Sequence, residues 1–268
     1  MERRGPHHSP DLEKRGGGSR PLMAEVRLTR RDRGPALGDA RSRWAVNVNV
    51  HGIGPRPSRP LEEGEDQVWI SVEQFEGLLD TAIGRPDVTI TFDDGNASDL
   101  EIGLPRLLER GLTARFFVCA GLLGDPGRLD DAGVKELHGA GMVIGSHGWS
   151  HRDWRSLDWG PRGGSDVHDE LVRARRHLER LTGAEVSEVA VPFGSYDRHV
   201  VRGLRRTGAS RIYTSDGGWA RRGAWLQART SIRRDDGPDW PRRIMLERPA
   251  LRQRARSQVM RAAKRLRG

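Results

Sequence analysis

Apolar and polar positions alternate in blocks along the chain from Trp44 onward. Seven apolar runs, each seven to nine residues long, have the length and composition of strands buried in a sheet. The predicted strands are 44–52, 88–95, 114–121, 142–148, 188–194, 211–218 and 225–233. Between these runs the chain is amphipathic, which is typical of helices that cover a sheet. The predicted helices lie near 71–83, 98–110, 130–140, 166–181 and 197–207.

The order of these elements determines the fold class. Strands that alternate with helices form βαβ crossovers, and such crossovers build a parallel sheet. We therefore predict an α/β fold whose sheet is either open or closed into a (β/α) barrel. In both arrangements the functional residues lie at the C-terminal ends of the strands.

Ionisable residues and glycines gather at the predicted strand ends, whereas the strand interiors are apolar. These end segments are His51-Gly52, Asp93-Asp94-Gly95, Ser146-His147-Gly148, Pro192-Phe193-Gly194 and Asp216-Gly217-Gly218. Because the carboxyl ends of parallel strands meet at one edge, we expect these residues to surround a single site.

The charge of the chain is concentrated at its two ends. The chain has 46 basic and 37 acidic residues and a net charge of +9. Residues 1–43 carry 11 basic and 6 acidic residues, and residues 250–268 carry 7 basic and no acidic residues. The segment between them is mildly acidic, which argues against a basic groove built into the fold, and we expect no specific nucleic-acid partner.

Composition also predicts the organisation of the chain. Residues 1–43 are rich in Arg, Gly and Pro without periodicity, which predicts a disordered basic leader. Residues 44–249 form the predicted domain, and residues 250–268 repeat apolar positions every three or four residues, as in a basic amphipathic helix. The first 20 residues contain no apolar run of signal-peptide length, so we expect a cytoplasmic protein.

Two pairs of residues carry the candidate chemistry. Asp93 and Asp94 are consecutive at a strand end, so their side chains diverge and can take different roles. His147 and His151 are four residues apart, and if this segment turns helically their imidazoles share one face and can bind one cation. Two imidazoles and one carboxylate leave coordination positions open, as in catalytic metal sites.

The segments TFDDG (91–95), SHGWSH (146–151) and VPFGSYD (191–197) resemble the motifs of NodB-like polysaccharide deacetylases, carbohydrate esterase family four. The resemblance covers roughly residues 44–240 and implies an irregular (β/α) barrel of about seven strands. It implies that Asp94, His147 and His151 bind a divalent cation, commonly zinc, with cobalt, manganese or nickel as alternatives. It further implies that Asp93 is the general base and that an N-acetylated sugar loses its acetyl group as acetate.

The third motif, residues 191–197, is expected to supply the donor that amide hydrolysis requires. The tetrahedral intermediate of amide hydrolysis needs a fixed donor for its oxyanion, and we assign this to the backbone N–H of Phe193. Pro192 fixes the turn, and Gly194 lets the substrate approach the main chain. The alternative is that this segment is an ordinary strand-to-helix turn capped by Ser195 or Asp197. The two interpretations are compatible, since a capped turn can also donate to an oxyanion.

The sequence departs from the family pattern at two positions. Many relatives begin the third motif with an Arg that orients the catalytic Asp, but here the residue is Ala190. Arg229 is the candidate replacement. Relatives also place a general-acid His near the end of the domain, and no His follows His199. His51, at the end of the first strand, is the candidate acid or binding group.

Three further residues complete the predicted site. Trp149 and Trp219 are candidate platforms for a pyranose ring, because a flat apolar face with a polar edge suits a sugar. Asp216 is expected to accept a hydrogen bond from a histidine ligand and so to orient it.

The C-terminal helix has three interpretations. It could dock on the barrel, lie on an anionic membrane surface, or contact nucleic acid. Association with the inner membrane surface fits a cytoplasmic enzyme that acts on a lipid-linked saccharide.

We therefore predict a metal-dependent hydrolase that removes N-acetyl groups from a sugar, glycan or glycan precursor. The main alternative is a catalytically silent carbohydrate-binding protein that retains the barrel and the metal site. A non-haem iron oxygenase shares the ligand types but does not explain the second Asp of the first motif. A zinc protease would need a Glu directly after the first His, where Gly148 stands.

Overall fold

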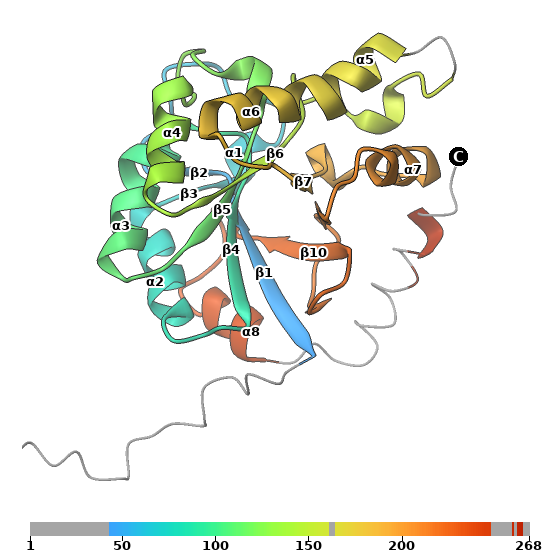
Figure 1. The fold of residues 1–268 in the computed structure, drawn as a ribbon. Coiled ribbons are helices and arrows are strands. Elements are labelled where there is room, and N and C mark those ends of the chain that lie inside the picture. The colour runs from blue at the N-terminus through green and yellow to red at the C-terminus, as the bar shows by residue number, and fades with distance from the viewer. Residues whose placement is uncertain (1–42, 161–163, 248–258, 260–261, 265–268) are drawn as a thin grey trace, which may run out of the picture. The chain divides into compact units, whose positions relative to one another are not determined.

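The computed structural model describes residues 43–160, 164–247, 259 and 262–264 (Figure 1). The predicted leader, residues 1–43, lies outside the described residues except for Arg43. Most of the predicted C-terminal helix, residues 250–268, also lies outside the described residues. The part of this segment that is described, residues 259 and 262–264, is helical.

Seven parallel strands close into a barrel, and each of the seven predicted strands is confirmed. In spatial order they are β1 (Trp44–Val50), β4 (Val88–Phe92), β5 (Ala114–Val118), β6 (Val143–Ser146), β7 (Glu188–Ala190), β8 (Arg211–Thr214) and β10 (Leu226–Ser231). The ring closes where β10 pairs with β1, in a register that aligns Asn47 with Arg229 and Asn49 with Ser231. The fold is thus the irregular (β/α) barrel that the sequence predicts.

Only three residues of β1 pair with β10 where the barrel closes, because the start of the same edge of β1 pairs with another strand. The last residues of β1 pair with β10, whereas Trp44 and Ala45 pair with the antiparallel strand β9 (Ala220–Arg221). Figure 1 shows the tip of β10 (orange) reaching β1 (blue) at this seam. Two-residue strands such as β9, and the parallel pair β2 (Gly52–Ile53) and β3 (Trp69–Ile70), have no hydrophobic period and were not predicted.

Helices cover the outside of the barrel (Figure 1). Each predicted helix is present: α2 (Val72–Ala82), η1 (Asp99–Gly103) with α3 (Leu104–Glu109), α4 (Asp131–Gly139), α5 (Gly164–His168) with η4 (Asp169–Arg173) and α6 (Ala174–Thr182), and α7 (Arg198–Arg206). Two short helices, α1 (Glu65–Val68) and α8 (Trp240–Leu246), were not predicted. Among the described residues, no helix combines the length and the apolar character needed to cross a bilayer.

The two faces of β1 explain where the site forms. Val46, Val48 and Val50 belong to the main apolar core, in which Phe92 stacks on Phe116 with ring centroids 4.4 Å apart. Because side chains alternate along a strand, Asn47 and Asn49 lie on the opposite face of β1, inside the barrel, and both are buried. The barrel interior is therefore partly polar, and its polar groups continue into the cavity at the C-terminal ends of the strands.

Candidate active site

A cavity of about 300 Å³ lies at the C-terminal ends of the strands. Of the ionisable residues at the predicted strand ends it contains all except Asp216, together with groups from the segment after β2 and from β10. Its lining comprises His51, Glu62, Glu63, Gly64, Glu65, Val68, Asp93, Asp94, His147, His151, Phe193, Ser215, Ser231 and Arg233.

Asp93 is a buried carboxylate held by a guanidinium on a different strand. Arg229 of β10 donates from Nη1 to Oδ1 at 2.6 Å and from Nη2 to Oδ2 at 2.7 Å. Asn49 of β1 adds a hydrogen bond to Oδ2 at 2.9 Å, and Arg229 itself is fully buried. This bidentate pair fixes the carboxylate in position and orientation.

The charges around Asp93 control its ionisation. Burial disfavours the charged form, but the charges of Arg229 and His147 and the Arg229 hydrogen bonds outweigh it, so the pKa of Asp93 lies below its usual range. Asp93 is therefore ionised at neutral pH and can accept a proton.

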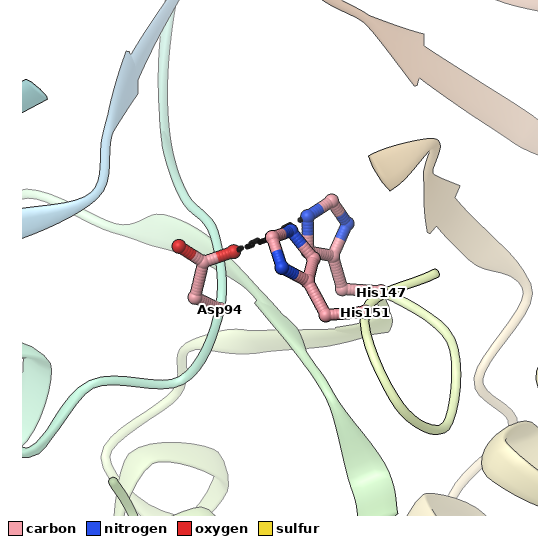
Figure 2. A group of neighbouring side chains, drawn as sticks. All are labelled: Asp94, His147 and His151. Atoms are coloured by element: carbon pink, nitrogen blue, oxygen red, sulfur yellow. Dashed lines mark ion pairs between the residues drawn. The ribbon is translucent and has the colours of Figure 1, made fainter. Parts of the chain in front are cut away.

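Asp94, His147 and His151 point toward one another (Figure 2). Asp94 Oδ1 lies 3.4 Å from His147 Nε2 and 3.3 Å from His151 Nε2. One oxygen and two imidazole nitrogens that converge in this way can hold one metal ion. Asp94 Oδ1 is buried without a hydrogen-bond partner among the described residues, and a bound cation would satisfy it.

The other imidazole nitrogens are already engaged. His147 Nδ1 lies 2.9 Å from the carbonyl oxygen of Ala190, and His151 Nδ1 lies 2.7 Å from the Glu62 carboxylate. A carbonyl or carboxylate oxygen only accepts, so each Nδ1 carries the hydrogen and a neutral ring presents its Nε2 lone pair to the cavity. The residues therefore fit a divalent metal.

Burial and neighbouring charges act in opposite directions on these ligands. Burial raises the pKa of Asp94, but the contact with His147 and the charges of His151, His51 and His147 hold that pKa well below its usual range. Burial lowers the pKa of His151, but the hydrogen bond and charge of Glu62 and the charge of Asp94 raise it overall.

The segment between the two histidines is not helical, contrary to the helical turn considered above. The imidazoles nevertheless meet, with ring centroids 5.2 Å apart. Gly148 and His151 both have positive φ, of 89° and 54°, and these residues bend the chain back on itself. Glu170 holds this loop, as described below.

His51 stands beside the Asp93 carboxylate. Its Nε2 lies 3.9 Å from Asp93 Oδ2 and 3.4 Å from the Asn49 amide nitrogen. Its Nδ1 is buried and has no hydrogen-bond partner in the described part of the chain. Burial lowers the pKa of His51, although the charges of Asp94 and Asp93 partly counter the effect.

The third motif places Phe193 at the mouth of the cavity. Phe193 has a φ of 57°, is 58% exposed, and its ring centroid lies 4.4 Å from that of His151. Pro192, which precedes it, is buried. A Cβ at Gly194 would lie 2.7 Å from the Cβ of Ser215, so packing within the fold already requires a glycine there, and the expected approach of a substrate stays a prediction.

Neither tryptophan predicted as a sugar platform lines the cavity, and both pack against the main core. Trp149 packs on the main core, and one face of its ring is covered by the guanidinium of Arg173 at 3.8 Å. Trp219 donates from Nε1 to the carbonyl of Ile244 at 3.2 Å and precedes β9, which pairs with the start of β1. It therefore lies toward the end of the barrel away from the cavity. The exposed aromatic ring that lines the cavity is Phe193.

Asp216 does not take the predicted role, because Ala190 O and Glu62 hold the histidine nitrogens. Asp216 accepts hydrogen bonds from Tyr196 Oη at 2.8 Å, from Thr214 Oγ1 at 2.8 Å and from Lys264 Nζ at 2.7 Å. Lys264 also donates to the carbonyl of Gly194 at 3.1 Å, so the C-terminal segment contacts the barrel at this residue. Val259 is 68% exposed, and membrane association of the C-terminal helix stays a prediction.

Three functional residues were missed by the sequence analysis: Asn49, Glu62 and Glu170. Asn49 could have been found from the sequence, because Asn47 and Asn49 alternate with valines in WAVNVNV and so indicate a polar face inside the barrel. Glu62 and Glu170 could not be found from the sequence. Glu62 lies in a loop and Glu170 in a helix, and neither is adjacent in sequence to the residues that it holds.

Residues 81–212 match the family model described as polysaccharide deacetylase. No curated protein matches the chain. Among solved structures, the chain is similar to the PplD deacetylase of Streptococcus pyogenes in complex with acetate, with 19% identity and a TM-score of 0.65 over 76% of this chain and 99% of that one. It is also similar to IcaB from Ammonifex degensii, with 22% identity and a TM-score of 0.59 over 75% of this chain and 95% of that one.

A polysaccharide deacetylase from Bacillus cereus is 17% identical, with a TM-score of 0.62 over 80% of this chain and 68% of that one. At such identities these structures establish a shared fold. The family match covers the strands and loops that carry Asp93, Asp94, His147 and His151. Over residues 81–212, which carry these four residues, the chain therefore matches the polysaccharide deacetylase family, and the solved structures show the same fold.

Proposed function

We propose that this protein is a metal-dependent deacetylase that removes the N-acetyl group from an N-acetylated sugar. One observation carries the proposal: the ionised, clamped carboxylate of Asp93 shares a cavity with the converging ligand atoms of Asp94, His147 and His151. A base beside a cation site is what hydrolysis of an unactivated amide requires.

Asp94 Oδ1, His147 Nε2 and His151 Nε2 would hold the cation. When bound, a divalent ion such as zinc lowers the pKa of water and polarises the acetamide carbonyl. Zinc fits two imidazoles and one carboxylate, and cobalt, manganese and nickel accept the same ligands.

Asp93 acts as the general base. Its two oxygens are oriented by Arg229, and its lowered pKa keeps it ionised, so it can take a proton from water as the acetyl carbon becomes tetrahedral. The guanidinium is committed to this carboxylate and cannot itself supply a proton to the leaving group.

His51 is the residue placed to protonate the leaving amine. Of the three histidines that line the cavity, His147 and His151 face Asp94, which leaves His51. Since burial lowers the pKa of His51, it starts the reaction neutral and must gain its proton during turnover. Its Nε2 lies 3.9 Å from Asp93 Oδ2, beyond hydrogen-bond distance, so the proton that Asp93 takes from water would reach His51 through a bridging water and pass to the sugar nitrogen as the C–N bond breaks.

The cavity suits a single sugar ring. Its volume of about 300 Å³ is at the small end of the range for ligand pockets. Phe193 offers an exposed aromatic face above His151 for the ring, and its backbone N–H is the candidate donor to the oxyanion.

The test is acetate release from nucleotide-linked, lipid-linked and polymeric N-acetylhexosamines by protein whose metal content is measured. We expect acetate from at least one class, and loss of both metal and activity in Asp94→Ala and His147→Ala. Protein that holds zinc but releases no acetate from any class would instead support a silent carbohydrate-binding protein.

A further inference from the structure

The loop that joins the two histidine ligands has an unfavourable backbone. Gly148 has a φ of 89°, and His151 has a φ of 54°, a conformation that non-glycine residues rarely adopt. No helical hydrogen bonds stabilise residues 147–151. Something outside the loop must therefore hold it in the shape that brings the two imidazoles together.

Glu170 makes four hydrogen bonds that do this. Its Oε2 accepts from the backbone N–H of Trp149 at 2.9 Å and from Trp154 Nε1 at 3.1 Å. Its Oε1 accepts from the backbone N–H of Ser150 at 3.0 Å and from Ser150 Oγ at 2.6 Å. Three of the four donors lie between the two ligand histidines.

Glu170 is buried, and the ligand loop approaches its carboxylate closely. Its carboxylate is 2% exposed, and it projects from the π-helical turn η4 between α5 and α6. A Cβ on Gly148 would lie 2.3 Å from Glu170 Oε2, so only glycine lets the loop approach the carboxylate this closely. A buried carboxylate is stable only when donors satisfy it, and here the ligand loop supplies most of them.

We propose that Glu170 is a positioning residue that holds His147 and His151 in the geometry that binds the metal. The inference rests on the proposed function, because it gives Glu170 a role in metal affinity in addition to fold stability. Glu170 acts through the loop backbone, whereas Ala190 and Glu62 act on the imidazoles themselves.

Glu170→Gln is the principal variant. The amide nitrogen of Gln cannot accept from an N–H group, so the bond from the backbone N–H of either Trp149 or Ser150 is lost while the volume of the side chain is kept. Ser150→Ala is a milder variant that removes only the 2.6 Å bond from an exposed residue and leaves the core intact.

The matched control is Glu179→Gln on α6. Glu179 accepts from Arg175 Nε at 2.8 Å and from the backbone N–H of Val186 at 3.2 Å, so it supports the same helical stretch without touching the ligand loop. A purely structural role for Glu170 would give the two Gln variants similar behaviour.

The experiment measures the affinity of the full chain for Zn²⁺ by competition with a chelator, and the absorption spectrum of bound Co²⁺. We expect Glu170→Gln to bind Zn²⁺ roughly 10- to 100-fold more weakly and to change the Co²⁺ spectrum, since such supporting contacts typically have that effect. Ser150→Ala should weaken binding several-fold, and Glu179→Gln should bind like the wild type. Amide hydrogen exchange at Trp149 and Ser150 should be slow in the wild type and fast in Glu170→Gln.

Zn²⁺ affinity within twofold of the wild type in both Glu170→Gln and Ser150→Ala would overturn the inference. If Glu170→Gln does not fold, unchanged affinity in Ser150→Ala is sufficient to overturn it. A wild-type protein that binds neither Zn²⁺ nor Co²⁺ while its Trp149 and Ser150 amides are protected would refute the proposed function instead.

Discussion

The two ends of the barrel both contain a carboxylate paired with arginine, but only one end can do chemistry. At the N-terminal end, Glu188 accepts from Arg115 Nε at 2.7 Å, from Arg211 Nη1 at 3.2 Å and from Tyr213 Oη at 3.2 Å. At the C-terminal end, Asp93 is clamped in a similar way by Arg229, but the neighbouring Asp94 keeps an unsatisfied buried oxygen.

An aromatic layer lies between these two clusters. Phe117 and Tyr213 pack with ring centroids 4.9 Å apart, and the Arg229 guanidinium lies 5.4 Å from the Phe117 ring. A charged cluster alone therefore does not mark an active site. The distinguishing feature is a buried acceptor that the protein leaves without a donor, next to an open cavity.

The largest expected effect is the loss of turnover in Asp93→Asn. Removing a general base typically costs 10²- to 10⁴-fold in rate, about 3–5 kcal/mol in the activation free energy. The metal should be retained, because Asp93 is outside the ligand set. The measurement is acetate release by protein with verified metal content, and wild-type rates in this variant would show that the base is a different residue.

Arg229→Ala should lower the free energy of unfolding by about 3–5 kcal/mol, because the substitution leaves the Asp93 charge buried and unpaired. Adding Asp93→Asn to Arg229→Ala should recover part of this loss. Urea unfolding of the two single variants and the double variant measures the coupling. Strict additivity of the two effects would contradict a clamp between these residues.

Glu62→Gln should weaken Zn²⁺ binding about tenfold, because the imidazole of His151 loses a charged acceptor at Nδ1. Glu63→Gln is the control, since Glu63 also lines the cavity and is exposed. Chelator competition compares the two, and equal affinities would show that Glu62 does not support the ligand.

At the opposite end, Glu188→Gln should lower the free energy of unfolding by about 1 kcal/mol and leave acetate release unchanged. Its arginine partners are partly exposed, so water replaces much of the lost interaction. A fall in activity larger than the fall in stability would mean that the aromatic layer couples the two ends.

The smallest expected effect is a pH dependence at this same end. Burial raises the pKa of Tyr213 above its unfolded value near 10. The contribution of Tyr213 to stability is therefore complete below about pH 10 and is lost as the pH rises through the folded pKa. Urea midpoints between pH 8 and 11 should fall more steeply for the wild type than for Tyr213→Phe, and parallel curves would contradict this expectation.

Much of the fold could be predicted because a parallel barrel buries its strands on both faces. The seven apolar runs and the amphipathic helices between them follow directly from this burial. The missed elements are too short to have a period: β9 has two residues, and α1 has four. β9 forms by pairing with the start of β1, a contact between distant residues that no local pattern describes.

The reactive residues were predictable because they are adjacent in sequence at strand ends, as with Asp93 and Asp94. The residues that hold them come from distant parts of the chain, and only Arg229 was identified among these. For the tryptophans, adjacency in sequence was a poor guide. An aromatic residue next to a ligand, such as Trp149, was assigned to the substrate, although the loop turns its ring into the core.

The position of Arg229 has a consequence for how the protein folds. Asp93 and Arg229 are 136 residues apart, and Arg229 lies on the last strand of the barrel. Contacts between such distant residues form late, because a large loop must close before they can contribute. During synthesis, a chain that has emerged only as far as β8 already contains every candidate metal ligand but not the clamp on its base. The seam strand therefore completes the barrel and the hydrolytic site in a single step.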